Sequence, residues 1–258
     1  MIRGAITSYM DVAQVVLYAF FAFFACLIYY LRQEDRREGY PLESEALGRQ
    51  KERGFLLIPT PKIFRLPHGG TVQAPRFDVD PRAHKSVKVA PWPGAPFIPV
   101  GDPMKAEVGP GAYALRADVP EKTFDGRNLL APLRVATNYA VPSEDSNPIG
   151  MTVLGADGRT GGAIADIWVD RSESVVRYYE VETGAAGLTR RVLLPVTFAK
   201  INSWLRQVNV EAILGAQFAE APATREPDAV TLLEEEKVMA YYGAGTLYAT
   251  RQRAEPLI

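Results

Sequence analysis

The sequence predicts one N-terminal transmembrane α-helix followed by a mainly-β domain, a small antiparallel barrel or sandwich, that ends in a C-terminal helix. Three features carry this prediction: the uncharged apolar residues 12–31, the short alternating segments between residues 151 and 213, and helix-start chemistry at Thr231. A chain of 258 residues with 47% hydrophobic content can bury a core. The net charge of −1 provides no basic field for a phosphate backbone, so nucleic acid is not an expected partner.

The apolar stretch VAQVVLYAFFAFFACLIYYL, residues 12–31, contains no charged side chain. As an α-helix it would be about 30 Å long, which matches the hydrocarbon thickness of a bilayer. Tyr9 before the stretch and Tyr29 and Tyr30 at its end suit the two membrane interfaces. A signal peptide would have a shorter apolar region and a small-residue cleavage site, so we expect an uncleaved transmembrane helix.

Basic residues set the expected orientation of this helix. Arg32, Arg36 and Arg37 follow the apolar stretch, whereas Arg3 alone precedes it. The positive-inside rule therefore predicts that residues 1–11 are periplasmic and that the rest of the chain is cytoplasmic. The same three arginines and the interface tyrosines are expected to lie at the lipid head groups.

Proline dominates the middle of the chain, because 16 of the 20 prolines lie between Pro41 and Pro148. Proline removes backbone donors and fixes φ, so this region is expected to be extended with short strands. Its scattered apolar side chains need a surface. We expect residues 32–105 to pack on a partner protein, and a self-packed, loop-rich subdomain remains the alternative.

The remaining residues, 106–258, are assigned to the globular domain. Its expected strands are 151–155, 162–170, 175–182, 189–198 and 204–213, separated by turns at 156–159, 171–174, 183–187 and 200–203. Regular spacing of this kind is typical of a small antiparallel barrel or sandwich. Three glycine-rich sites, at residues 69–70, 161–162 and 243–245, lack the setting of a nucleotide loop and are interpreted as turns.

The C-terminal helix is expected to begin after Thr231, with Glu234 at capping-box spacing. The acids at 234–236 favour the positive end of the helix dipole, so they are interpreted as structural. Gly243 is the predicted residue just past the helix end.

Acidic residues concentrate on the predicted hairpin at residues 166–182. Asp170 and Glu173 flank its turn, Arg177 follows, and Asp166 lies on the same strand face as Asp170. Turn acids are usually solvated, but carboxylates gathered at a partly buried site can have raised pKa values and can pass protons. With two histidines and one cysteine, the chain offers too few ligands for a zinc or iron site and no nucleophile–base set.

Short motifs along nearly the whole chain resemble the H subunit of the purple-bacterial photosynthetic reaction centre. They are EDRREGYPL (34–42), PKIF (61–64), LPHG (66–69), GDPM (101–104), VGP (108–110), NPIG (147–150), DIWVD (166–170), LLEE (232–235) and GTLYA (245–249). Their order and spread favour this family over the alternatives, a membrane-tethered β-barrel adaptor without pigments and a membrane-anchored hydrolase.

The resemblance implies a subunit that is not an enzyme by itself, in a light-driven complex of the bacterial inner membrane that reduces quinone. In that family the L and M subunits hold the bacteriochlorophylls, bacteriopheophytins, quinones and non-haem iron, and the complex also carries a carotenoid; this chain is the principal ligand of none of them. The H subunit caps their cytoplasmic face with its PRC-type β-barrel and stabilises the quinone region. A cytochrome subunit and a light-harvesting ring are further partners that the family allows.

The resemblance also implies roles for particular residues. Acids of the matching hairpin, Glu173 and Asp170 with Arg177 and Asp166, help deliver protons to the secondary quinone. The further residues that it implies are Glu121 and Asp125 for proton transfer and Tyr40, Pro41 and His68 for partner contact. Some members have surface histidines near residues 121–128, whereas this chain reads EKTFDGRN there, so we expect weak inhibition by Zn²⁺.

Overall fold

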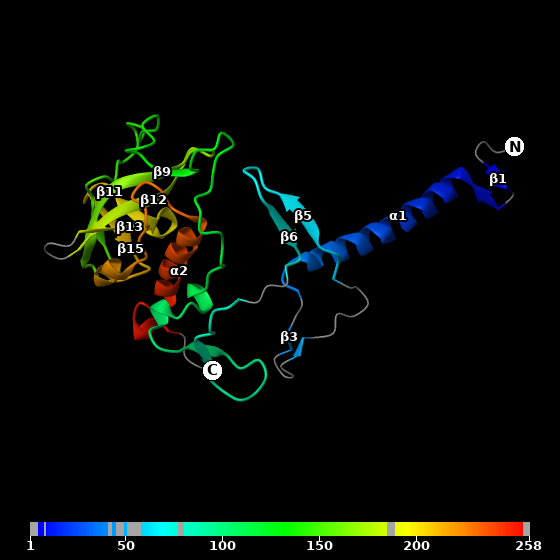
Figure 1. The fold of residues 1–258 in the computed structure, drawn as a ribbon, viewed down its shortest axis with the longest axis horizontal. Helices are drawn as coiled ribbons and strands as arrows, with labels where there is room; N and C mark the ends of the chain where they lie inside the picture. Colours follow the sequence, from blue (N-terminus) through cyan, green and yellow to red (C-terminus); the bar gives the residue numbers. More distant parts are fainter. Residues whose placement is uncertain are drawn as a thin grey trace. The chain divides into compact units, whose positions relative to one another are not determined.

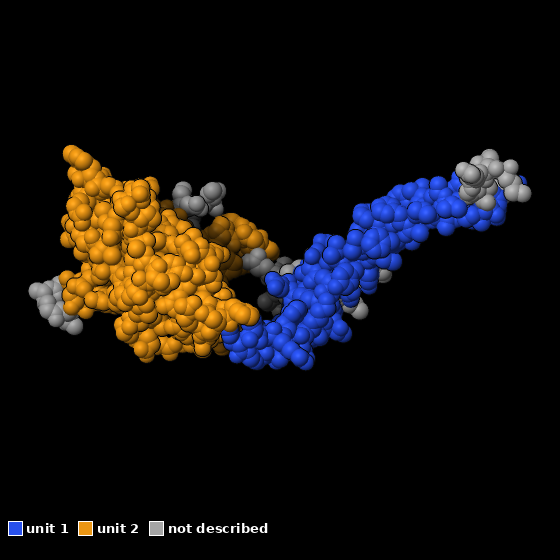
Figure 2. Space-filling view, turned by 90° about the horizontal axis from the view of Figure 1, so that it is seen from above, with its two compact units in different colours: residues 1–79 blue, residues 80–258 orange. Residues whose placement is uncertain are grey.

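The computed structural model describes residues 5–7, 9–40, 43–44, 49–50, 58–76, 80–184 and 189–254. Two of the sequence predictions, the partner contact of Pro41 and most of the turn at 183–187, lie outside the described residues. The contacts divide the chain into two compact units, residues 1–79 and residues 80–258 (Figure 2). Each unit is described below by itself.

The first unit is built on one long helix (Figure 1). Its elements are β1 (Ala5–Thr7), β2 (Met10–Asp11), α1 (Val12–Glu34), the 3₁₀ turn η1 (Asp35–Arg37), β3 (Glu43–Ser44), β4 (Arg49–Gln50), β5 (Lys62–Arg65) and β6 (Thr71–Ala74). Asp11 caps α1 by accepting a hydrogen bond from the Gln14 amide at 2.7 Å. Among the described residues, α1 is the single helix that is long and apolar enough to cross a membrane. The predicted span is therefore confirmed as one apolar helix.

The proline-rich region contains hairpins and 3₁₀ turns. Between residues 58 and 148, the described part of the chain has no α-helix and has two hairpins, β5–β6 and β7–β8. The elements beyond β6 are β7 (Ser86–Lys88), β8 (Phe97–Pro99), η2 (Pro103–Lys105) and η3 (Gly109–Gly111). The predicted turn at Gly69 and Gly70 joins β5 to β6, and both glycines have positive φ, +96° and +86°.

Seven strands of the second unit form one sheet in the order β13-β12-β11-β10-β15-β14, with β9 paired to the C-terminal part of β11. The strands are β9 (Leu130–Pro132), β10 (Thr152–Leu154), β11 (Thr160–Asp170), β12 (Val175–Thr183), β13 (Arg190–Pro195), β14 (Ala199–Asn202) and β15 (Gln207–Val210). The sheet curls into a half-barrel around the helix α2 (Leu232–Tyr248), which confirms the mainly-β barrel with a C-terminal helix (Figure 1). One pair, β10 with β15, is parallel, whereas the other pairs are antiparallel.

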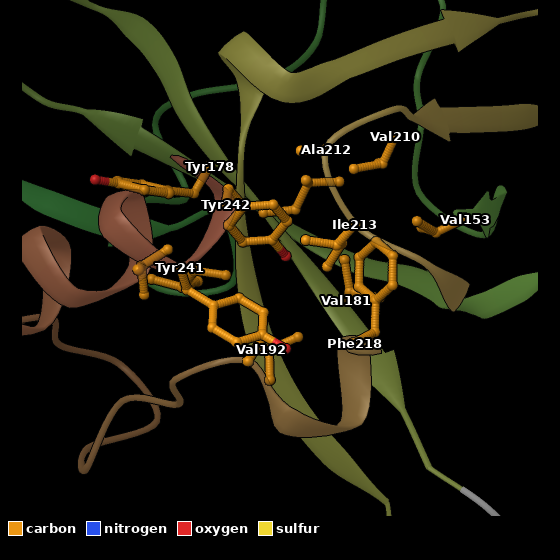
Figure 3. Close-up of a cluster of buried hydrophobic side chains, with 14 of the residues drawn as sticks. Val153, Tyr178, Val181, Val192, Val210, Ala212, Ile213, Phe218, Tyr241 and Tyr242 are labelled. Atoms are coloured by element: carbon orange, nitrogen blue, oxygen red, sulfur yellow. The ribbon is translucent and has the colours of Figure 1, made fainter. Parts of the chain in front are cut away.

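The core lies between the concave face of the sheet and α2. Figure 3 shows Tyr241 and Tyr242 of α2 beside Val181 and Val192 of the sheet, and Phe218 of η5 (Gly215–Glu220) closes the cluster. Strand β11 is buried on both faces from Asp166 to Asp170. A second apolar cluster, formed by Ala131, Ala136, Ile167 and Val169, covers its outer side.

Helix α2 begins as predicted but ends later. The Thr231 hydroxyl accepts from the Glu234 amide at 3.1 Å, and the Glu234 carboxylate accepts from the Thr231 amide at 2.9 Å, so the capping box is present. The prediction that Gly243 follows the helix end was wrong, because α2 continues to Tyr248. Gly243 is needed for close packing instead, since a Cβ atom there would lie 2.6 Å from the carbonyl oxygen of Pro110 in η3.

Two other predictions about turns were wrong. Gly161 and Gly162 lie inside β11, where a side chain at Gly161 would collide with the ring of Phe218. The predicted turn at 200–203 is largely strand β14. The chain turns at residues 203–206 instead, because the Asn202 side chain accepts from the Leu205 amide at 3.1 Å and so caps that turn.

The end of the proline-rich region packs on its own chain. Met104 belongs to the main core cluster, and Ala106 is buried. The contact division accordingly falls after Val79, earlier than the predicted start of the globular domain at residue 106. Trp92 and Phe97 remain exposed in this structure, so a partner surface for them stays a prediction.

Candidate functional site

The predicted acidic hairpin is formed by β11 and β12, and Asp170 organises its turn. One carboxylate oxygen of Asp170 accepts from the amides of Ser172 and Glu173 at 2.9 and 3.0 Å. The Ser174 amide donates to the Asp170 carbonyl at 2.9 Å, and Ser174 has a φ of +57°. These contacts fix the positions of the two acids, so the turn is a rigid support for them.

Arg177 brings the two acids of the turn together. Its Nη2 atom lies 3.3 Å from Oδ2 of Asp170 and 3.0 Å from Oε2 of Glu173. The Asp170 side chain is buried, whereas that of Glu173 is 63% exposed. The arrangement therefore connects a surface carboxylate with a buried carboxylate through one guanidinium group.

The structure adds two residues that the sequence analysis did not assign to this site, Tyr178 and Glu235. The buried Tyr178 hydroxyl donates to Oε2 of Glu235 at 2.9 Å. Burial raises the pKa of Glu235 above its usual range, and the negative charge of Glu121 acts in the same direction. Burial, together with the charge of Glu235, raises the pKa of Tyr178 well above its usual value, so its hydroxyl remains a donor.

Glu235 was interpreted as a structural acid because it lies in the first turn of α2. That interpretation holds for Glu234, which forms the capping box. Successive residues of a helix point about 100° apart, so Glu235 faces the sheet next to Tyr178. A run of three acids in one helical turn does not reveal which of them meets another element.

The loop at residues 121–128 contains the predicted surface acids. Asp125 accepts hydrogen bonds from the Thr123 hydroxyl and, at 2.6 Å, from Nε of Arg127. These hydrogen bonds, first from Thr123 and then from Arg127, lower the pKa of Asp125. A lowered pKa keeps this carboxyl ionised down to lower pH, and its role in proton transfer stays a prediction. Glu121 lies at the base of the loop, where its carbonyl accepts from the Leu129 amide.

Asp166 shares a strand with Asp170 but belongs to a different network. Its Oδ2 atom accepts from Nη1 of Arg134 at 2.9 Å, and the same nitrogen lies 2.9 Å from Oε2 of Glu180. The Trp168 indole also donates to Glu180 at 2.9 Å. This buried network joins β11, β12 and the segment after β9, and its position is typical of a structural role.

The predicted membrane-surface residues lie at the end of α1. Arg37 forms a two-nitrogen pair with Glu34 at 2.6 and 2.8 Å and donates to the carbonyls of Thr60 and Ala74 at 2.8 and 2.9 Å. Arg37 is therefore directed into its own chain. Arg32 pairs with its neighbour Asp35 at the surface.

The other predicted membrane-surface and partner residues lie on the last turns of α1, directly after it, or in the turn between β5 and β6. The Arg36 guanidinium lies 5.4 Å from the ring centroid of Tyr40, a cation–π contact. Tyr29 and Tyr30 are exposed on the last turns of α1, and His68 is exposed in the turn between β5 and β6. Lipid and partner contacts of these side chains stay predictions.

The described residues contain no group of three or more His, Cys, Asp or Glu side chains arranged to hold a metal ion. A hollow of about 540 Å³ lies beside the hairpin and is lined mainly by apolar side chains, among them Val141, Ile167, Val176, Tyr179 and Ile201. This hollow offers a packing surface rather than an acid–base site.

Two family models match the chain. Residues 4–135 match the model described as the photosynthetic reaction centre, H-chain N-terminal region, which is more than half of the sequence. The chain belongs to the reaction-centre H-chain family. Residues 143–217 match the PRC-barrel domain and include strands β10 to β15 of the half-barrel.

Family membership identifies the complex to which the apolar helix and the half-barrel belong. A protein of the H-chain family is a structural subunit of the photosynthetic reaction centre, and its complex comprises the L and M subunits, pigments and quinones. With α1 as its single apolar helix among the described residues, this H-chain family member is a single-pass membrane protein.

Proposed function

We propose that this subunit caps the cytoplasmic face of the L and M subunits, stabilises the quinone region and helps deliver protons to the secondary quinone. The observation that carries the proposal is the linked set Glu173, Arg177 and Asp170, in which a buried carboxylate is within reach of an exposed one. A quinone that accepts two electrons also takes up two protons. A site closed to bulk water needs fixed groups to supply them.

The hairpin has the chemistry that such a supply requires. Proton transfer needs donors and acceptors about 3 Å apart or bridged by water. Glu173 is exposed in this chain and suits the face turned towards the L and M subunits, where packing of a partner would bury it. Arg177 holds the two carboxylates beside each other through charge-assisted hydrogen bonds, so the exposed and the buried acid stay at one site.

Glu235 and Tyr178 extend this set into the half-barrel. The raised pKa of Glu235, caused by burial, lets its carboxyl exchange protons closer to neutral pH than a solvated glutamate does. Glu121 acts on Glu235 electrostatically, so a proton taken up near Glu121 would stabilise the ionised form of Glu235. We therefore favour Glu121 over Asp125 as the surface group, and Asp166 is assigned to structure.

The remaining assignments complete this proposal. The C-terminal domain is cytoplasmic and residues 1–11 are periplasmic, in a bacterial inner or intracytoplasmic membrane. Arg32, Arg36, Tyr29 and Tyr30 lie at the head groups, and the predicted partner contacts are Tyr40, Pro41 and His68. Contact with a cytochrome subunit or a light-harvesting ring stays a prediction.

The test is flash-induced proton uptake in reaction centres that contain the Asp170→Asn, Glu173→Gln double variant. Both replacements keep the size of the side chain, and the amide oxygen that replaces the Asp170 carboxylate can still accept the hydrogen bonds of the turn. We expect the proton-coupled second reduction of the quinone to slow by about 100-fold, the lower range for loss of a proton-transfer group. The first electron transfer, which needs no proton, should keep its rate.

Glu211→Gln provides the matched control, since Glu211 is an exposed acid paired with Lys200 at 2.7 Å outside the hairpin. This variant should leave proton uptake unchanged. A normal second reduction in the double variant would refute the delivery role while leaving the structural role of the subunit intact.

A further inference from the structure

The hairpin β5–β6 exposes apolar side chains beside the end of the transmembrane helix. Phe64, Leu66 and Val72 are between 37% and 49% exposed. The stretch 58–76 carries Lys62, Arg65 and Arg76 and contains no Asp or Glu. Apolar side chains among basic ones, without acids, are typical of a segment that lies on an anionic lipid surface.

Polar contacts hold the base of this hairpin against the end of α1. Arg37 donates to the carbonyls of Thr60 and Ala74, one on each side of the hairpin, at 2.8 and 2.9 Å. The Lys62 amine lies 2.6 Å from Glu34 and 3.4 Å from the hydroxyl of Tyr30. The partners of the hairpin in these contacts lie in the last turns of α1 or directly after it, where the apolar span ends.

The register of the hairpin decides which of its faces is turned towards the bilayer. Lys62 and Phe64 are two residues apart on β5, so they share a face, and Val72 is the cross-strand partner of Phe64. Lys62 reaches Tyr30, which lies about 6 Å deeper along the helix than Glu34. The face that carries Phe64 and Val72 is therefore the one directed towards the apolar span.

We propose that the β5–β6 hairpin is a second membrane anchor, with Phe64, Leu66 and Val72 inserted at the boundary between head groups and acyl chains. Arg76, and Arg65 from the opposite face at the end of β5, supply charge that complements anionic head groups, whereas Lys62 is paired with Glu34. Ile63 lies on the opposite face with its cross-strand partner Gln73. That face and the turn at His68 remain available to the protein partners of the complex.

The test uses spin labels on assembled reaction centres in vesicles that contain phosphatidylglycerol. Single cysteines replace Phe64 or Val72, each in a Cys26→Ser background, and Ile63→Cys and Gln73→Cys are the matched controls on the opposite face. Collision with apolar oxygen and with a water-soluble nickel chelate reports the surroundings of each label. We expect oxygen collisions to exceed nickel collisions several-fold at positions 64 and 72, and not at positions 63 and 73.

Two outcomes would overturn the proposal. Labels at 64 and 72 that are shielded from both reagents would show that a protein partner covers this face. Labels that collide with the nickel chelate as often as the controls would show that the face lies in water. Because the readout is local, neither outcome depends on proton delivery by the Asp170 hairpin.

Discussion

Trp168, Phe218 and Tyr242 are fully buried in residues 80–258, whereas Phe64 and Leu66 are exposed in residues 1–79. Both clusters of buried apolar side chains found among the described residues belong to the second unit. The first unit is ordered instead by a helix and by ion pairs around Arg37. The difference teaches that the second unit obtains hydrophobic stabilisation from its own core, whereas the exposed apolar side chains of the first unit have no core of their own among the described residues.

Removing a buried aromatic ring from the second unit should have the largest effect on the free energy of unfolding. Phe218→Ala is expected to lower the free energy of unfolding by about 3–5 kcal/mol, because the packed core cannot close around the lost ring. Urea unfolding of the full chain in mild detergent, followed by near-ultraviolet circular dichroism, measures this change. Phe124 is fully exposed, so Phe124→Ala should cost less than about 0.5 kcal/mol, as should Phe64→Ala. If Phe64→Ala lowered the free energy of unfolding as much as Phe218→Ala does, the two units would not differ in how they bury apolar side chains.

Removing the cation of the buried network should have the next largest effect. Arg134→Met is expected to cost about 3 kcal/mol, because Asp166 would remain buried without a cation, while Glu180 would keep only its pair with Arg191. Arg159→Met, at an exposed pair with Asp157, should change stability by less than about 0.5 kcal/mol in the same unfolding experiment. Similar costs for the two variants would mean that the buried network is solvated in solution.

Replacing either of two neighbouring tyrosines of α2 by phenylalanine should change stability by a smaller amount, and the two changes should differ in sign. The Tyr241 hydroxyl donates to the Gln217 carbonyl at 2.8 Å, whereas the buried Tyr242 hydroxyl has no hydrogen-bond partner among the described residues. Tyr241→Phe should therefore cost about 1 kcal/mol, and Tyr242→Phe should be neutral or stabilising by up to about 1 kcal/mol. Thermal unfolding of both variants tests this. A large loss in Tyr242→Phe would show that its hydroxyl is paired in solution.

The smallest expected effect is a change in how stability depends on pH. Burial raises the pKa of Glu235 in the folded state, so the stability from this group is present below the unfolded pKa and is lost as pH rises through the folded pKa. Glu235→Gln should remove that loss, and unfolding at a series of pH values between acid and neutral should reveal it. The hydrogen bond from Lys200 lowers the pKa of Glu211, so Glu211→Gln should change the pH dependence with the opposite sign, at lower pH. Parallel pH profiles for the two variants would contradict both assignments.

The sequence was sufficient to predict features that depend on residues close together in the chain, such as helix caps and hairpin turns. The capping box of α2 depends on two residues three positions apart, so spacing alone predicted it, and the uncharged apolar run predicted α1. The alternation of apolar and polar residues predicted β11 and β12, and it therefore also placed the acids of the turn between them. The placement of Asp170 and Glu173 at one site followed directly from that hairpin.

The tertiary structure alone decided which distant groups meet. Glu235 reaches Tyr178 across 57 positions of sequence, and Asp166 pairs with Arg134 rather than with the cluster around Asp170. The role of Gly243 depends on its approach to Pro110, far away in the chain. The parallel pairing of β10 with β15 likewise has no local signal, because pairing direction follows from how the chain returns to the sheet.

The sequence by itself determined the apolar span, the proline-broken middle and the acidic hairpin with its turn, because each of these depends on neighbouring residues and on backbone preference. Only the tertiary structure decided the burial of each carboxyl group, the partner of each cation and the contacts of the β5–β6 hairpin with the end of α1. These properties depend on long-range packing, and burial rather than residue type sets the pKa of a group such as Glu235.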